Sequence, residues 1–372
     1  MAAPGSANPT LTTTTPTLAI LDDYLDIASS HFTHIPKTGA RRRAPALHDH
    51  LVHARAHPFP ADLLRQLPNL KLLLATGTQF ESFDLAAARD LGIAVAVAPG
   101  AGRSDGRATA SASARARLDL TKGGSHPTTQ HAWALILALA RNVAADDAAI
   151  KTAPAPAPWQ TRLAKGLAGL TLGVVGLGRL GAAVARIAVL AFGMDVICWS
   201  ANLTQEKADS TAQELGLPVY GPLDDSGADA QTPTFRVVSK QELFAQADVV
   251  TLHYVLGDRS RGLVGVPELA AMKPSALLVN TSRGPLVEEA ALYDTLQRGR
   301  IAGAALDVFD LEPLPRDSRW RSPDWGTGGR SALVMTPHMG YVDEGLMHTW
   351  YEETAENVER WLQGKDLLHR LV

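Results

Sequence analysis

Apolar strand-like segments alternate with helix-like segments over most of the chain. The apolar segments include "LTLGVVG", "MDVICWS", "ALLVNTSRG" and "ALVMTPHMG", and the segments between them carry apolar residues at helical spacing, as in "RLGAAVARIAVLAFG". Nearly continuous apolar strands that alternate with amphipathic helices are typical of parallel sheets covered by helices on both faces. The pattern therefore predicts an α/β fold built on doubly wound parallel sheets.

The N-terminal third shows the same alternation on a smaller scale. "TLAILDDYLDIA" predicts a strand followed by a helix, and residues 59–100 alternate short helices with strands. A chain of 372 residues is longer than most proteins that fold around one core. We therefore expect two α/β lobes, preceded by a disordered tail over residues 1–16.

Two segments interrupt this alternation. Residues 100–125 are rich in Gly, Ala, Ser and Arg without hydrophobic periodicity, which predicts a flexible surface insertion. The segment that follows, "HPTTQHAWALILALARNV", predicts a helix capped by Thr128 or Thr129, with Trp133 and Ile136 on its apolar face. We expect this helix between the lobes, followed by an extended linker at "KTAPAPAPWQ".

Composition narrows the class of partner. The formal net charge is −3, so no basic field favours nucleic acid or an anionic membrane surface, and a small-molecule ligand fits better. Cys198 is the one cysteine, which excludes an internal disulfide framework and a thiolate metal cluster. The chain start lacks the features of a targeting peptide, and no apolar stretch approaches the ~20 residues of a spanning helix. We expect a cytoplasmic protein with no nucleic-acid partner, no membrane partner and no metal.

A glycine motif carries the clearest chemical signal. Gly176, Gly178 and Gly181 form G-x-G-x-x-G between the strand "LTLGVV" and an amphipathic helix. In this context the first glycine permits a tight turn, the second lets the backbone approach a pyrophosphate, and the third allows close helix packing. A plain strand-to-helix turn also favours glycine, but the flanking elements favour a dinucleotide site.

The next strand ends without the acid that usually binds the ribose 2′-hydroxyl of NAD. That acid is expected about 20 residues after the motif, and Ser200 stands there instead. Without a carboxylate, nothing repels a 2′-phosphate, and the side chains of Ser200, Asn202 and Thr204 can donate hydrogen bonds to one. NADP is therefore slightly favoured over NAD. Dual use stays open, because the nearest cation is Lys207, and Ser200 could also be an ordinary strand-end residue.

Polar side chains follow three later strands, at the edge of a parallel sheet where ligands bind. These are Arg283 in "VNTSRGP", Asp307 and Glu312 in "ALDVFDLEPLP", and His338 in "TPHMGY". Singly, each could be a surface or structural residue. Together with a nicotinamide fold, they supply a carboxylate anchor, an orienting acid and a proton donor, which is what reduction of a 2-keto acid requires.

The motifs "GVVGLGRLG", "LVNTSRGPLVEEAAL", "GAALDVFDLEPLP" and "TPHMGYV" resemble the signatures of the D-isomer-specific 2-hydroxyacid dehydrogenase family, in family order over roughly residues 126–372. The resemblance implies that Arg283 binds the substrate carboxylate and carbonyl, with backbone N–H groups of Gly77 and Thr78 on the same carboxylate. It implies that His338 is the general acid and that Glu312 fixes its tautomer.

The resemblance also implies a set of cofactor contacts. Asp307 would hold the nicotinamide carboxamide, and Arg179 and Leu180 would meet the pyrophosphate. The full set of implied cofactor-binding residues is Gly176, Gly178, Arg179, Leu180, Gly181, Ser200, Asn202, Val255, Thr281, Asp307 and Gly340.

The lobes receive functional labels from the same resemblance. Residues 17–127 with 341–372 would form a substrate-binding (catalytic) domain, and residues 128–340 an NAD(P)-binding Rossmann domain, with the cleft between them and a homodimer as the assembly. The favoured substrates are small 2-keto or 2-hydroxy acids such as glyoxylate or hydroxypyruvate. The alternative is a dinucleotide-regulated interaction protein like the carboxyl-terminal-binding corepressors, while formate dehydrogenase is disfavoured because glutamine replaces Glu312 there.

The chain departs from the family in the first lobe. Residues 30–56 are short, basic and poorly periodic where the family carries a further strand and helix. We therefore expect a thinner sheet in that lobe. In the substrate loop, Gln79 stands where a close subgroup often has arginine, so the sequence does not identify the acid.

Overall fold

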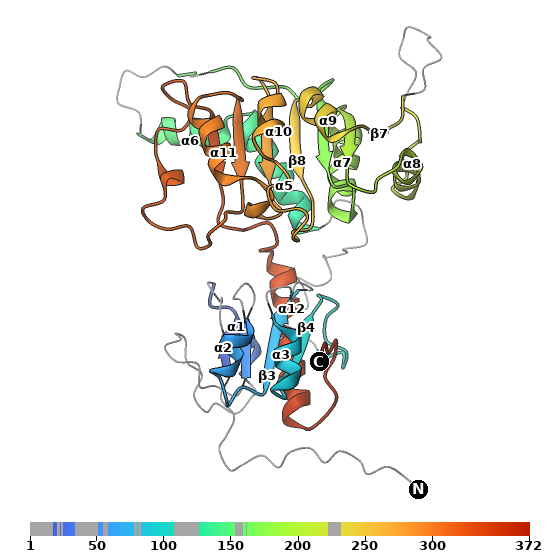
Figure 1. Ribbon diagram of the computed structural model, residues 1–372, viewed down its shortest axis with the longest axis vertical. Coiled ribbons are helices and arrows are strands. Elements are labelled where there is room, and N and C mark those ends of the chain that lie inside the picture. The colour runs from blue at the N-terminus through green and yellow to red at the C-terminus, as the bar shows by residue number, and fades with distance from the viewer. Residues whose placement is uncertain are drawn as a thin grey trace. The chain divides into compact units, whose positions relative to one another are not determined.

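The computed structural model divides the chain into two compact units. The smaller unit comprises residues 1–118 and 343–372, and the larger unit comprises residues 119–342 (Figure 1). The residues that the structure describes are 18–20, 23, 25–33, 51–54, 59–77, 80, 83–107, 126–152, 159–160, 162–221 and 232–372. The predicted tail over residues 1–16 and most of the predicted insertion lie outside the described residues.

The sheet of the smaller unit is parallel, and its described strands follow one another in chain order. They are β1 (Leu18–Ile20), β2 (Leu51–Ala54), β3 (Leu72–Thr76) and β4 (Ala94–Ala98). Strands β3 and β4 are buried along nearly their whole length, and Phe59 and Leu64 belong to the core beside them. The strand β2 lies inside residues 30–56, so the expectation that this segment lacks a strand was wrong.

The helices of the smaller unit are α1 (Ala28–His31), α2 (Ala61–Arg65), α3 (Leu85–Asp90) and the long C-terminal α12 (Glu344–Leu362). Helix α12 contacts β3, β4 and α1. It buries aromatic side chains such as Trp350 and Tyr351, and it also buries the acids Glu352, Glu353 and Glu356. Buried carboxylates require hydrogen-bond donors, and much of the supply comes from the loop after β4.

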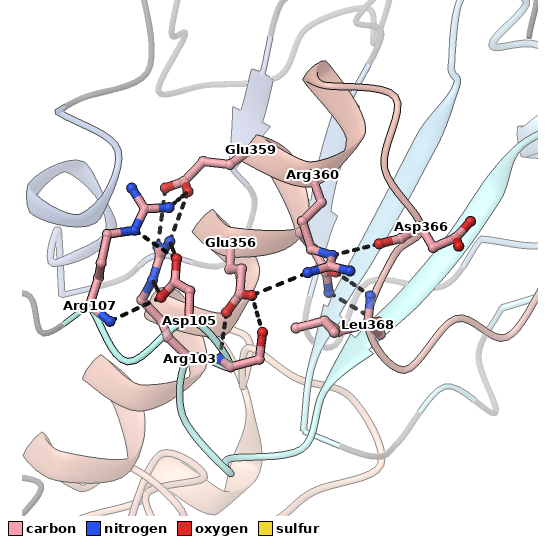
Figure 2. A network of polar contacts seen from close by, with 10 residues as sticks. Arg103, Asp105, Arg107, Glu356, Glu359, Arg360, Asp366 and Leu368 are labelled. Carbon is pink, nitrogen blue, oxygen red and sulfur yellow. Dashed lines mark hydrogen bonds and ion pairs between the residues drawn. The ribbon is translucent and has the colours of Figure 1, made fainter.

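Residues 100–107 of that loop are bound to α12 through a polar network (Figure 2). The backbone amides of Gly100 and Gly102 donate to Glu353, and Ser104 donates to Glu356 through its amide and its hydroxyl. Arg103 pairs with Asp105 at 2.7 Å and with Glu359 at 2.8 Å. This differs from the predicted flexible insertion, which included these residues, because the acids that bind them lie some 250 positions away along the chain.

The sheet of the larger unit is parallel throughout, with the order β11-β10-β9-β8-β5-β6-β7 among its described strands. The strands are β5 (Thr171–Val175), β6 (Asp195–Trp199), β7 (Phe235–Val237), β8 (Val249–Leu252), β9 (Leu277–Asn280), β10 (Gly303–Leu306) and β11 (Ala332–Met335). From β5 the chain adds β6 and β7 on one side of the sheet and then β8 to β11 on the other side. This reversal creates the topological switch point, where such sheets bind ligands.

Helices cover both faces of this sheet, which confirms the doubly wound fold predicted from the apolar strands (Figure 1). One core contains residues of α5, α7 and α8, and the other contains residues of α9, α10 and α11. The helices and 3-10 turns are α5 (Pro127–Ala140), α6 (Val143–Thr152), α7 (Arg179–Phe192), α8 (Gln205–Glu214), α9 (Lys240–Gln246), α10 (Val266–Ala271), η1 (Gly284–Leu286), α11 (Glu289–Gln297) and η2 (Arg319–Arg321).

Helix α5 begins earlier than predicted. His126 is its N-cap and Pro127 its first residue, and the ring Nδ1 of His126 accepts a hydrogen bond from the amide of Thr128 at 3.2 Å. The sequence indicated Thr128 or Thr129 as the cap, because hydroxyl residues are the commoner choice. In the described part of the chain, no helix is both long and apolar enough to cross a membrane.

Candidate active site

The glycine turn after β5 has the close backbone packing that its spacing predicts. Gly176 has a φ of +97°, and a Cβ there would lie 2.4 Å from the carbonyl oxygen of His253. A Cβ at Gly181 would lie 2.0 Å from the carbonyl oxygen of Gly176. Gly178 caps α7 without a side-chain hydrogen bond and faces open space, so the first amides of α7 are available to an anion. The turn fits a pyrophosphate.

The loop after β6 presents polar groups and a cation. Ser200 follows the strand directly, and Thr204 caps α8 by accepting the amide of Lys207 at 3.3 Å. The ammonium of Lys207 folds back and donates to the carbonyl of Asn202 at 3.0 Å. The cation that the sequence indicated only by proximity therefore lies beside Asn202, one of the two predicted cofactor residues of this loop.

The end of β8 is tied to the same loop. Tyr254 stacks on Trp199 with ring centroids 6.0 Å apart, and its hydroxyl accepts the amide of Ala201 at 3.3 Å. The next residue, Val255, is 78% exposed. An exposed apolar side chain at the switch point fits the predicted cofactor contact.

Glu312 and His338 are in direct contact. The carboxylate of Glu312 lies 2.6 Å from Nδ1 of His338, and its other oxygen accepts the amide of Phe309 at 2.8 Å. Because a carboxylate only accepts hydrogen bonds, Nδ1 of the imidazole must carry a proton. Glu312 therefore holds one of the two ring nitrogens, and Nε2 is the ring nitrogen that it leaves open to proton exchange with a ligand.

Arg283 follows the neighbouring strand β9, and its Nη1 donates to the carbonyl of Ser282 at 2.7 Å. The backbone after Arg283 packs closely against the segment that leads to Glu312. A Cβ at Gly284 would lie only 2.1 Å from the carbonyl carbon of Phe309. Arg283, Glu312 and His338 therefore follow three adjacent strands, β9, β10 and β11, at one edge of one sheet.

Asp307 has surroundings that the sequence did not indicate. Its carboxylate is fully buried and accepts the amides of Met339 at 2.7 Å and Gly340 at 2.8 Å, the hydroxyl of Thr336 at 2.5 Å, and Nε2 of His131 at 3.2 Å. Burial by itself would raise the pKa of Asp307, but the hydrogen bonds outweigh it and the pKa is lowered. With donors on both oxygens, this carboxylate organises the turn that carries His338.

Two further predicted cofactor residues lie beside this turn and β9. Thr281 is buried, and its hydroxyl has no hydrogen-bond partner among the described residues, so it can serve a ligand. Gly340 contacts Asp307 so closely that a Cβ would lie 3.1 Å from the carboxylate. The amide of Gly340 already donates a hydrogen bond to Asp307, so it is not open to a ligand.

The predicted substrate loop belongs to the smaller unit. Gly77 has a φ of +78°, and its amide donates to the carbonyl of Ala98 at 2.8 Å. This corrects the expectation that the Gly77 amide is open to a substrate carboxylate. Thr78 and Gln79 lie outside the described residues.

Sequence reasoning missed two histidines near the site. His131 lies on α5 and bonds to Asp307, and His253 lies beneath the glycine turn, with Nε2 2.9 Å from the hydroxyl of Thr251. A signal existed for His131, which is the one titratable residue in the α5 sequence "PTTQHAWALILALA". His253 follows an apolar strand and carries no comparable signal.

Comparisons with known proteins agree with these features. A family model described as "D-isomer specific 2-hydroxyacid dehydrogenase, NAD binding domain" matches residues 133–340. The chain is 30% identical to the glyoxylate reductase of Korarchaeum cryptofilum over 85% of its own length and 80% of the relative's. It is 32% identical to the D-3-phosphoglycerate dehydrogenase of Methanocaldococcus jannaschii over 82% of its own length, and it spans about half of that relative, 48%.

A solved structure shares the fold. The phosphoglycerate oxidoreductase of Vibrio cholerae O395 superposes with a TM-score of 0.71 at 26% sequence identity, which covers 94% of this chain and 100% of that one. Similarity at this coverage extends over both units rather than over the glycine motif alone.

Proposed function

Because the chain belongs to the D-isomer-specific 2-hydroxyacid dehydrogenase family, we propose that it transfers a hydride between a nicotinamide dinucleotide and a small 2-keto or 2-hydroxy acid. The observation that carries this proposal is the 2.6 Å contact between Glu312 and His338 at the edge of a sheet with a glycine turn at its switch point. The relatives are named as reductases and dehydrogenases, which favours an enzyme over the corepressor alternative.

Each of the three side chains has a separate role in carbonyl reduction. When bound, the dinucleotide supplies the hydride for C2 of the keto acid. His338 donates the proton on Nε2 to the carbonyl oxygen, and Glu312 keeps the ring oriented through Nδ1. Arg283 binds the carboxylate through its planar fork and stabilises negative charge on the carbonyl oxygen. In the direction of oxidation, neutral His338 accepts the hydroxyl proton at the same Nε2.

The glycine turn and the orphaned hydroxyl of Thr281 would hold the dinucleotide. NADP is the slightly favoured form, because Ser200 removes the carboxylate that would repel a 2′-phosphate and Lys207 places an ammonium in the same loop. NAD remains the alternative, since the matching family model is described by NAD binding.

A homodimer is the proposed assembly. Helix α6 buries none of its residues, and large apolar side chains on and after it are exposed, with Trp159 at 84% and Leu163 at 99%. Exposed apolar side chains of this kind mark protein interfaces. Sedimentation equilibrium of the wild type and of a Trp159→Ser, Leu163→Ser double variant tests this: a dimer that becomes a monomer supports the surface, and a monomeric wild type rejects it.

The activity test is a steady-state assay of the purified protein. NADPH or NADH is mixed with glyoxylate, hydroxypyruvate or, in the oxidising direction, D-3-phosphoglycerate, and the nicotinamide absorbance is followed. Turnover with at least one acid supports the proposal and ranks the substrates. Tight cofactor binding without turnover of any of these acids would favour a regulatory role instead.

A further inference from the structure

The buried carboxylate of Asp307 is the structural centre of the turn after β11. Besides the side-chain bonds described above, the backbone carbonyl of Asp307 accepts the amide of His338 at 2.8 Å. His338 itself has a φ of +57°, a left-handed conformation that a side chain with a Cβ rarely adopts. The turn keeps this conformation because Asp307 binds three successive amides, those of residues 338 to 340.

His131 is the donor to Asp307 that comes from outside this turn and the adjoining strand. It lies on α5, a helix whose Trp133 and Ile136 are buried and which packs on β9, β10 and β11. Its Nε2 is 3.2 Å from Oδ1 of Asp307 and 3.0 Å from the hydroxyl of Thr336. The helix therefore connects the turn to the rigid core of the larger unit.

The direction of this hydrogen bond follows from its chemistry. An ionised carboxylate has no proton to give, so Nε2 of His131 must be the donor. Thr336 directs its own hydroxyl to Asp307 and can therefore accept from the same Nε2. Among the donors to the Asp307 side chain in the described part of the chain, His131 is the titratable one, and the others are two amides and a hydroxyl.

We propose that His131 is a positioning residue, which holds the Asp307 carboxylate against α5 and thereby fixes the turn that aims His338. The assignment of His338 as proton donor rests on the proposed function, whereas the mechanical link from His131 to the turn does not. A displacement of about 1 Å at a reacting group can cost up to a hundredfold in rate. Loss of the link should therefore lower kcat while the glycine turn still binds the dinucleotide.

The test compares two substitutions at the same position. His131→Leu removes the donor, whereas His131→Gln replaces Nε2 with an amide nitrogen at a similar reach. We expect His131→Leu to lower kcat about tenfold or more and to raise the dissociation constant of NADPH by a clearly smaller factor, because the turn with Asp307 and Gly340 shifts while the glycine turn does not, and we expect His131→Gln to restore most of kcat. Ala134→Leu, at an exposed position of the same helix, is the control and should match the wild type.

A second readout does not depend on turnover. The imidazole signals of His338 are recorded by NMR on histidine-labelled protein and assigned by their loss in His338→Gln. We expect His131→Leu to shift or broaden these signals and the amide signals of Met339 and Gly340, and His131→Gln to restore them. If His131→Leu does not fold, His131→Ala is measured in its place.

The outcomes separate the two proposals. If the wild type reduces a 2-keto acid but both kcat and the His338 signals are unchanged in His131→Leu, the positioning role is overturned and the proposed function stands. If the wild type reduces no acid but the signals respond as expected, the link stands and the proposed function fails. Equal losses of kcat in the Leu and Gln variants would also reject the hydrogen bond as the cause.

Discussion

Nδ1 of His338 lies 2.6 Å from the carboxylate of Glu312, and the other oxygen of that carboxylate accepts the amide of Phe309. The imidazole is thus held by an acid that is itself fixed to the backbone. Under the proposed function, this arrangement makes Nε2 the nitrogen that exchanges the proton and gives the two side chains different roles, which substitutions can separate.

His338→Gln should reduce kcat by about a thousandfold or more, because the proton donor is removed while the glycine turn is untouched. Steady-state kinetics with the best keto acid measures the loss, and fluorescence titration with NADPH should give a dissociation constant close to that of the wild type. Turnover at the wild-type rate would show that another group delivers the proton.

Glu312→Gln should have a smaller effect, with kcat lowered about ten- to a hundredfold. The amide oxygen of glutamine can still accept from Nδ1, but it no longer supplies the negative charge that stabilises a protonated ring. The measurement is steady-state kcat with the best keto acid, compared among the wild type, Glu312→Gln and Glu312→Ala, which also removes the acceptor for Nδ1. A kcat for Glu312→Gln equal to that of the wild type would remove the charge of Glu312 from the mechanism.

Ser200→Asp should shift the preference from NADPH toward NADH, because a carboxylate at the end of β6 repels a 2′-phosphate and can bind the 2′-hydroxyl of the ribose. The ratio of kcat/KM for NADPH to that for NADH should fall about tenfold or more. Ser200→Ala is the control, since it removes the hydroxyl without adding charge. If both variants keep the wild-type ratio, Ser200 does not contact the ribose.

His253 should make the folded protein sensitive to acid. Burial lowers its pKa from the ordinary 6.5 to about 4, and Nδ1 has no hydrogen-bond partner among the described residues. Between these pH values the unfolded chain binds a proton that the folded chain does not, so stability is full above pH 6.5 and decreases as the pH falls toward 4.

The decrease due to His253 amounts to at most about 3 kcal/mol in the free energy of unfolding. His253→Gln cannot titrate, so its urea-unfolding midpoint should fall less steeply than that of the wild type over this pH range. Parallel curves for the two proteins would contradict a His253 that stays neutral in the folded protein.

Arg103→Met should destabilise the smaller unit by roughly 1 to 3 kcal/mol, because it removes from Glu359 and Asp105 a guanidinium that is only 2% exposed, while Arg107 stays paired with both acids at 2.6 and 2.7 Å. That guanidinium also holds the pKa of Asp105 well below its usual range. Arg65→Met removes an ion pair with Asp62 in which the arginine is 62% exposed, and it should cost less than about 0.5 kcal/mol. Urea denaturation followed by circular dichroism gives both values, and equal losses would contradict this contrast.

Local patterns predicted the parts of the site that depend on neighbouring residues. The glycine spacing at Gly176 fixes a turn in which backbone atoms approach each other closely. The strands β9 and β11 end three residues before Arg283 and His338, so both residues lie at the carboxyl edge of the sheet. Both are consequences of short segments of sequence. The doubly wound fold followed for the same reason.

Contacts between distant segments could not be predicted in the same way. His131 and Asp307 are 176 positions apart, and nothing local to either residue indicates the other. Glu353 and Glu356 of α12 are buried, and the loop after β4, some 250 positions away, supplies their hydrogen-bond donors. Likewise, Gly77 is the glycine expected in the substrate loop, yet its amide donates a hydrogen bond to the carbonyl of Ala98 on the neighbouring strand.

Helix α12 has a consequence for biosynthesis. It completes the core of the smaller unit, but it emerges from the ribosome only after the whole of the larger unit has been translated. Until then the smaller unit lacks Glu353, which accepts the amides of Gly100 and Gly102, and Glu359, one of the two acids that pair with Arg103. The larger unit contains every described strand of its own sheet within residues 119–342 and can therefore fold first.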